Sequence, residues 1–274
     1  LIIIGIAVFT TSGTLQASTF TTPFVDGILE GYQTFDAIGG VVVGAVIIIS
    51  LNYSSHTTFD AKRNLLRKAG FIAGIGLLLI YGGLILSGAL LGPTFAEGTT
   101  RTAVLSGLST QTLGNFGTQF LSVLVALACF TTAVGIVTGT ADYISGICKN
   151  SKKAYLITAA IASIIGVLVG SYQVGFIIIL AVPALMFLYP ITIVLIVLNV
   201  LPDKLASKKV FRGVVLVTFL FSIPDFLGFV IPSAYLVDLK NLIPLANASL
   251  GWVLPAFLVF MGLNIIAFKT KTSN

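Results

Sequence analysis

Residues 30–36 read Glu-Gly-Tyr-Gln-Thr-Phe-Asp and lead directly into 37–51, a run of 15 residues without any charge. Fifteen helical residues extend about 22 Å, whereas the hydrocarbon layer of a membrane is about 30 Å thick. A helix that crosses a membrane here must therefore reach back through the polar stretch to about Phe24. Residues 24–51 give about 42 Å of helix, with Asp36 about 22 Å from the far end and so within the hydrocarbon layer.

A carboxylate at that depth costs about 2.5 kcal/mol or more, so it usually faces a cavity or a partner. Gly27 and Gly31 bracket a place where we expect the helix to unwind, and unwound backbone is tolerated there only if it lines a cavity. Broken helices of this kind form the sites of many secondary transporters. The half-helix that begins near Asp36 directs free N–H groups and partial positive charge at the break. Asp36 caps that half-helix or binds a ligand, and both roles can hold together.

The whole chain has the composition of an integral membrane protein. Its 274 residues are 57% hydrophobic and only 9% charged, with a mean hydropathy of +1.08, whereas soluble domains have about 25% charged residues. The apolar runs are long enough for helices, so we predict an all-α membrane fold. Hydropathy indicates eight segments, near 1–12 (truncated), 24–51, 69–92, 113–147, 154–170, 175–200, 213–231 and 242–268.

The basic residues predict the orientation of the chain. Thirteen of the fifteen follow alternate segments: Lys62, Arg63, Arg67, Lys68, Lys149, Lys152, Lys153, Lys204, Lys208, Lys209, Arg212, Lys269 and Lys271. The positive-inside rule places these regions and the C-terminus in the cytoplasm. Topology accounts for the basic charge, so we expect no nucleic-acid partner. Of the connections, 93–112 is nearly uncharged and is either a folded cap or an ordinary loop.

A second polar feature lies in the fourth segment. Residues on one helical face recur at spacings of three and four: Ala128, Thr131, Thr132, Gly135, Thr138 and Asp142. Threonine hydroxyls with the Ala128 carbonyl are hard oxygen ligands without net charge, which suits Na⁺. The alternative is that these hydroxyls bond carbonyls of their own helix or join helices together. In the sixth segment, Pro183 and Pro190 predict a kink or hinge.

Little in the sequence favours an enzyme or a channel. The two cysteines, Cys129 and Cys148, form no CxxC pair, so we expect neither a disulfide nor a metal site. The single histidine, His56, lies in a polar loop, so there is no nucleophile–base pair and no histidine-rich metal motif. A channel would be expected to show symmetric pore-lining repeats, and none is evident.

Three stretches taken together resemble the bacterial branched-chain amino acid:cation symporters, the LIVCS or BrnQ family. They are EGYQTFDAIGG at 30–40, ACFTTAVGIVTGTADY at 128–143 and VPALMFLYP at 182–190. The resemblance extends over the whole chain and corresponds to the part of the family from the end of its fifth span to its twelfth. The chain opens on Leu1 within an apolar run, so we expect 1–274 to be one transporter domain that begins partway through a helix.

The resemblance implies an inverted-repeat fold of the leucine-transporter type. Residues 24–200 would form the second repeat, in which 24–51 corresponds to the family's broken sixth helix and 113–147 to its eighth helix. Residues 201–274 would add two further helices. It implies symport of leucine, isoleucine or valine across the cell membrane, without a cofactor and with Na⁺ or H⁺ as the coupling ion. Another amino acid or nucleobase permease of the same fold is the alternative.

The resemblance also implies the residues of both sites. The amino acid would bind at the unwound Gly31–Thr34 backbone and beside it, at Gly31, Tyr32, Gln33, Thr34 and Asp36. A partial sodium site would be formed by Ala128, Thr131 and Thr132, which match the family's spacing of i, i+3 and i+4. The implied partners are the amino acid and the lipid bilayer, and the oligomeric state is left open.

Overall fold

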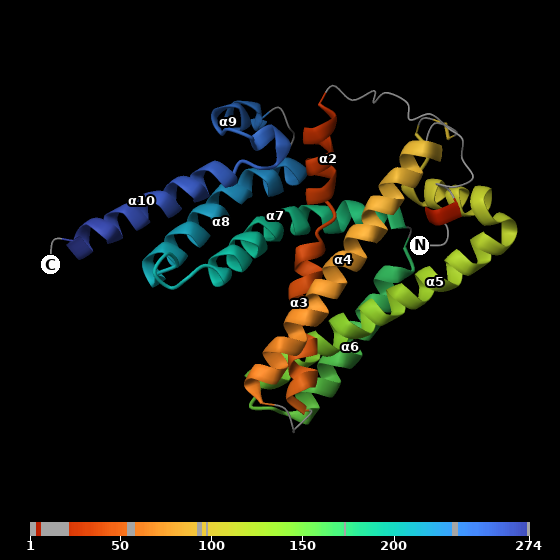
Figure 1. Cartoon of the computed structure of the whole chain (residues 1–274), viewed down its shortest axis with the longest axis horizontal. Helices are drawn as coiled ribbons and strands as arrows, with labels where there is room; N and C mark the ends of the chain where they lie inside the picture. Colours follow the sequence, from red (N-terminus) through yellow and green to blue (C-terminus); the bar gives the residue numbers. More distant parts are fainter. Residues whose placement is uncertain are drawn as a thin grey trace. The chain divides into compact units, whose positions relative to one another are not determined.

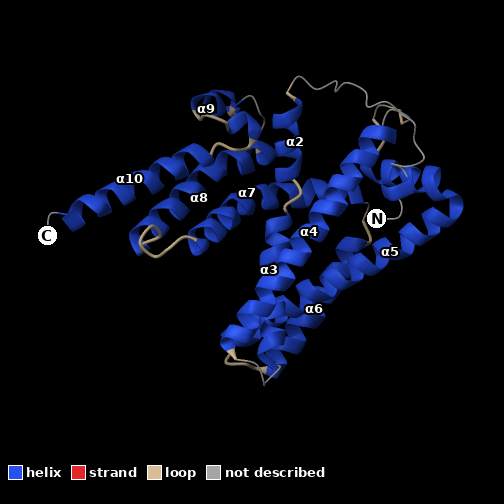
Figure 2. Cartoon of the chain, in the orientation of Figure 1, coloured by secondary structure: helices blue, strands red, loops and turns tan. Residues whose placement is uncertain are grey.

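The computed structural model describes residues 4–6, 22–53, 58–91, 95–96, 98–172, 174–231 and 235–272. Within these ranges every regular element is a helix (Figure 2), which confirms the predicted all-α class. The principal helices are α2 (Pro23–Tyr32), α3 (Asp36–Tyr53), α4 (Phe59–Leu91), α5 (Arg101–Ile147), α6 (Lys152–Gly170), α7 (Val174–Val200), α8 (Lys208–Val230), α9 (Val237–Leu242) and α10 (Val253–Thr272).

In the described part of the chain, six segments are long and apolar enough to cross a membrane. They are formed by α2 together with α3 and by α4, α5, α6, α7 and α8. Residues Val253–Phe268 of α10 form a shorter apolar helix. These helices bear out the prediction of a multi-pass membrane protein. The first predicted segment, 1–12, lies mostly outside the described residues, as does His56.

The chain divides into two compact units. The first contains residues 1–23 and 43–143, and therefore the end of α3, all of α4 and most of α5. The second contains residues 24–42 and 144–274, and therefore α2, the start of α3 and the helices from α6 to α10.

In the first unit, α5 bends sharply at Gly114 (Figure 1), which has a φ of 62° and a ψ of −157°. The helix doubles back there, so that the hydroxyls of Thr110 and Thr118 lie 2.7 Å apart. A Cβ added at Gly117 would lie 2.7 Å from the Ser109 carbonyl oxygen. The arm that precedes the bend packs Leu108 against Leu91 of α4. Most of the 93–112 connection is therefore folded as a helix.

In the second unit, α8 packs against both α7 and α10 (Figure 1). The N-terminus of α8 is capped by Ser207, whose hydroxyl accepts the Val210 amide. The packed core consists of Val194, Leu198, Val210, Val214, Trp252 and Ala256. Burial of branched and aromatic side chains gives these three helices the best-packed interface of this unit.

The prediction for the last segment is wrong at its N-terminal end. It was predicted to begin at residue 242, but α10 begins at Val253, after α9 and a short 3₁₀ helix at Ala246–Ala248. Pro244 has no amide hydrogen to continue a helix. Leu245 and Ser249 both have left-handed backbone, with φ values of 65° and 55°, which ends the helical path. Hydropathy does not register these local interruptions.

The two prolines of the sixth predicted segment lie inside α7, which is a helix from Val174 to Val200. Neither Pro183 nor Pro190 can donate the usual bond to the preceding turn. The Pro190 ring is fully buried, so tertiary packing holds this part of α7. The predicted hinge at these residues stays a prediction.

Candidate functional site

The predicted broken helix is present. The helix α2 ends at Tyr32, α3 begins at Asp36, and the residues between them, Gln33–Phe35, are not helical. The last regular bond of α2 is donated by the Gln33 amide to the Leu29 carbonyl, at 3.0 Å. The break therefore lies inside one apolar span, with a helix end on one side and a helix start on the other.

The position of the break differs from the prediction. Gly27 and Gly31 both remain within α2. The turn is closed by Thr34, whose amide and hydroxyl donate to the Gly31 carbonyl at 3.2 and 2.8 Å. The residue with left-handed backbone is Phe35, with a φ of 55°. A hydrogen bond from the Thr34 side chain, rather than the flexibility of a glycine, ends the first half-helix. Nothing in the sequence indicated that Phe35 would have left-handed backbone.

Aromatic contacts from distant segments hold the break in place. The Tyr32 ring packs edge-on against Tyr189 of α7, with ring centroids 4.9 Å apart. Phe35 contacts the same Tyr189 ring at 5.2 Å. The Trp252 indole N–H donates to the Tyr32 hydroxyl oxygen at 3.3 Å. Because Tyr189 and Trp252 are each only 7% exposed, they form a firm support for the two residues that flank the turn. A residue in this backbone region costs about 1–3 kcal/mol and needs such support.

Most of the predicted substrate residues are exposed beside the aromatic support that Tyr189 and Trp252 form. Gly31, Gln33, Thr34 and Asp36 are exposed, and Tyr32 is half-buried. Asp36 lies in the first turn of α3, where a carboxylate interacts favourably with the helix dipole. The amides of a helix's first turn suit a carboxylate ligand in general, and in α3 the Ile38 amide donates to the Phe35 carbonyl at 3.1 Å. The arrangement can therefore bind a small zwitterion through both of its charged groups.

In the first unit, the predicted sodium residues converge on one carbonyl of α5. The Thr131 and Thr132 hydroxyls both donate to the Ala128 carbonyl, at 3.0 and 2.9 Å. Thr138 bonds its own helix in the same manner. The three oxygens are close enough to share one ion, but the hydroxyl hydrogens must first turn away from the carbonyl. The observed bonds are those of the alternative interpretation, in which the threonines satisfy their own helix.

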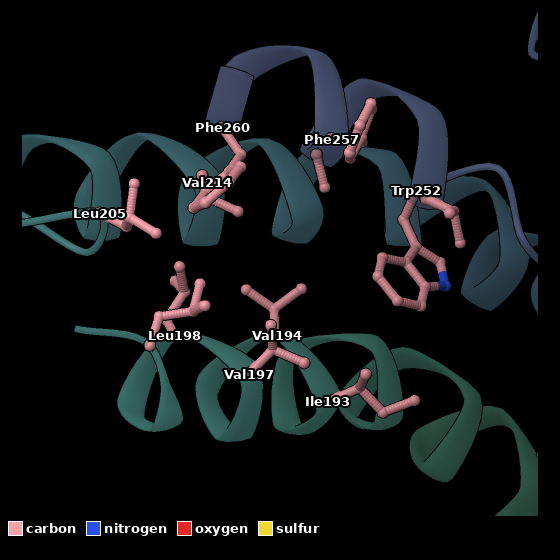
Figure 3. A pocket seen from close by; sticks show the side chains of 12 residues that line it. Ile193, Val194, Val197, Leu198, Leu205, Val214, Trp252, Phe257 and Phe260 are labelled. Atoms are coloured by element: carbon pink, nitrogen blue, oxygen red, sulfur yellow. The ribbon is translucent and has the colours of Figure 1, made fainter. Parts of the chain in front are cut away.

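An apolar cavity lies beside the aromatic support, between α7, α8 and α10 (Figure 3). Its volume is about 420 Å³. Val194 and Leu198 point into it from α7, and Trp252 closes one end. Among the residues that the structure describes, no charged side chain lines it, so it is unsuited to the charged groups of a zwitterion.

Comparison with known proteins identifies the family. Residues 1–271 match the family model described as branched-chain amino acid transport protein. The chain belongs to this family. The recognition of the branched-chain amino acid transport family from its motifs is thereby confirmed, and the family description names a transport protein, as predicted, rather than an enzyme.

Several relatives within the branched-chain amino acid transport family are similar along most of the chain. The branched-chain amino acid transport system 2 carrier protein of Pseudomonas aeruginosa is 34% identical over 260 residues, which are 93% of this chain and 59% of the relative. The branched-chain amino acid permease BraB of Bacillus subtilis is 34% identical over 267 residues, with 93% and 58% covered. The chain thus spans somewhat under two thirds of the length of these relatives. No solved structure matches it.

For this member of the branched-chain amino acid transport family, sequence reasoning missed one buried acid. Asp225 of α8 is only 4% exposed. Within the described part of the chain, its Oδ1 atom has no hydrogen-bond partner. The available signal was its isolation, because Asp225 is the one charged residue between Arg212 and Asp238. The missed partners of the break, Trp252 and Tyr189, gave no comparable signal.

Proposed function

We propose that this protein is a secondary transporter that moves leucine, isoleucine or valine across the cell membrane by cation symport. The observation that carries the proposal is the helix broken within an apolar span of a chain from this family. Its relatives are named as branched-chain amino acid carriers and permeases. Unwound backbone at membrane depth is characteristic of substrate sites in secondary transporters.

The amino acid binds at the break in this proposal. Its carboxylate accepts from the first-turn amides of α3, where the helix dipole is positive. Its ammonium group is bound by oxygens at the end of α2 and by Asp36. The exposed Gln33 and Thr34 and the half-buried Tyr32 are within the same short turn, so a ligand there contacts all the predicted residues with little movement.

The coupling ion is Na⁺ or H⁺. For Na⁺, Ala128, Thr131 and Thr132 supply three oxygens after the two hydroxyls rotate, and the remaining ligands come from other segments. Rotation sacrifices two bonds within α5, so binding is weak enough for release. Rocking of packed helices then alternates access to the two sides of the membrane.

The orientation in this proposal follows the basic residues. The connections rich in lysine and arginine lie in the cytoplasm, together with the C-terminus. Arg101 and Lys240 lie on the outer side. Residues 24–200 form the second inverted repeat, followed by the two helices of 201–274.

Uptake of labelled leucine into vesicles that contain the full-length protein tests the function. Imposed Na⁺ and pH gradients are applied separately, with unlabelled isoleucine, valine, alanine and uracil as competitors. We expect one gradient to drive accumulation and only branched-chain amino acids to compete. Uptake that responds to neither gradient, or that uracil inhibits, would contradict the proposal.

A double variant, Thr131→Val with Thr132→Ala, tests the sodium residues. We expect Na⁺-driven uptake to fall by about tenfold or more, as when groups that support a bound metal are removed. Thr140→Val is the matched control, because its hydroxyl also bonds its own helix, to the Ile136 carbonyl at 2.8 Å. Equal uptake in the double variant and the control would exclude these residues from the ion site.

A further inference from the structure

The most unusual polar group in the second unit is the carboxyl group of Asp225. Its helix α8 is apolar enough to cross a membrane, and its side chain is 96% buried, being 4% exposed. Among the described residues nothing donates a hydrogen bond to Oδ1. A buried carboxylate without donors is costly, so it is normally neutralised by a proton, a cation or a basic side chain.

The groups that face Asp225 come from neighbouring helices. Lys240 of α9 is the basic side chain that attracts its negative charge, and the titratable side chains that α2 and α7 bring together in this unit are Tyr32 and Tyr189, with ring centroids 4.9 Å apart. Residues 253–268 of α10 contain no titratable group. The basic residues of α8 itself are distant, because Arg212 lies 13 positions away, or about 20 Å along the helix.

Lys240 lies near the carboxyl group without satisfying its free oxygen. A Cβ added at Gly228, one turn after Asp225, would lie 3.4 Å from the Lys240 ammonium nitrogen. Gly228 and Lys240 also line a cavity of about 240 Å³ with Leu236, Val237, Asn241 and Asn247. Its lining is mostly apolar, with Lys240, Asn241 and Asn247 as the polar members, and its volume has room for several waters of about 30 Å³ each.

We propose that Asp225 is a proton-binding site within the second unit. Oδ1 takes a proton from a hydronium ion, forming an O–H bond and leaving a water molecule, and later returns the proton to water. One carboxyl group offers too few oxygens for Na⁺, whereas a proton needs only one.

Infrared spectroscopy of the purified full-length protein tests proton binding without any transport. We expect a carboxylic-acid C=O band that titrates with pH and is lost in Asp225→Asn, a nearly isosteric change. Asp225→Glu should retain a shifted band. Asp203→Asn, an exposed acid between α7 and α8, is the control and should leave the band unchanged. A spectrum that Asp225→Asn does not alter overturns the proposal.

The link to transport rests on the proposed function and is tested in Na⁺-free vesicles. A gradient of about one pH unit drives about tenfold accumulation when one proton moves with each substrate. We expect Asp225→Asn to lose this accumulation but keep leucine exchange within about twofold. Accumulation equal to that of Asp203→Asn would overturn the link. If the unaltered protein takes up no leucine under any gradient, the proposed function fails, while the infrared result still decides whether Asp225 binds a proton.

Discussion

Two long apolar helices of this protein are interrupted, and the interruptions are maintained in different ways. In α5 the bend at Gly114 is local, since the residues that meet across it, Thr110 and Thr118, belong to the same helix. At the break between α2 and α3, the supporting residues Tyr189 and Trp252 are remote in sequence. The first interruption needs a glycine. The second uses Phe35 in left-handed backbone and depends on tertiary contacts.

The difference explains why only the second interruption is a candidate substrate site. Around Gly114 the Thr110 and Thr118 hydroxyls bond one another, and Thr131 and Thr132 further along α5 donate to a carbonyl of their own helix. At the break, backbone groups at two helix ends face the same turn, and Asp36 lies beside them.

The largest effect is expected from removing the remote support. Trp252→Ala deletes a core side chain and the bond to Tyr32, so we expect a loss of about 3–5 kcal/mol in the free energy of unfolding. Reversible denaturation in detergent micelles measures it. Trp252→Phe keeps most of the packing and should lose only about 1 kcal/mol. Equal losses in both variants would show that the hydrogen bond, and not the packing, supports the break.

A smaller effect is expected at the local bend. Gly114→Ala puts a Cβ on backbone that only glycine adopts readily, at a cost of about 1–3 kcal/mol. The helix can relieve this strain by straightening, so spin labels at Leu105 and Phe120 should move apart by pulsed electron resonance. Gly166→Ala in α6 is the control, because a Cβ there has no neighbour within 4 Å. An unchanged label distance would mean that tertiary contacts also hold this bend.

The smallest effect on the free energy of unfolding is expected when the hydroxyl of either of two matched threonines is removed. Thr34 and Thr131 each donate a hydroxyl to the carbonyl three residues earlier, at 2.8 and 3.0 Å. Thr34→Val should cost about 0.5–1.5 kcal/mol, because it removes a bond that closes the break. Thr131→Val should change the free energy of unfolding by less than about 0.5 kcal/mol, because the helical bonds of α5 remain. Micelle denaturation compares them directly, and equal losses would remove the distinction between the two regions.

Much of the architecture was predictable because it depends on local composition. The spans, the broken helix near residues 31–36 and the family all follow from runs of apolar residues and from short motifs. Gly27 and Gly31 were nevertheless expected to bracket the break, whereas it lies at Gln33–Phe35, after both glycines. Glycine marks where a helix can end, whereas the Thr34 side chain determined where it did end.

The amino-acid sequence by itself determined the helical membrane class and the family, because hydropathy and motifs are properties of neighbouring residues. Only the tertiary structure decided that Trp252 supports Tyr32 and that Asp225 is buried within the second unit. Burial and hydrogen bonding between residues as distant as 32 and 252 depend on how helices pack. An isolated acid in an apolar run shows that a charge is present, but only the packed helices show what faces it.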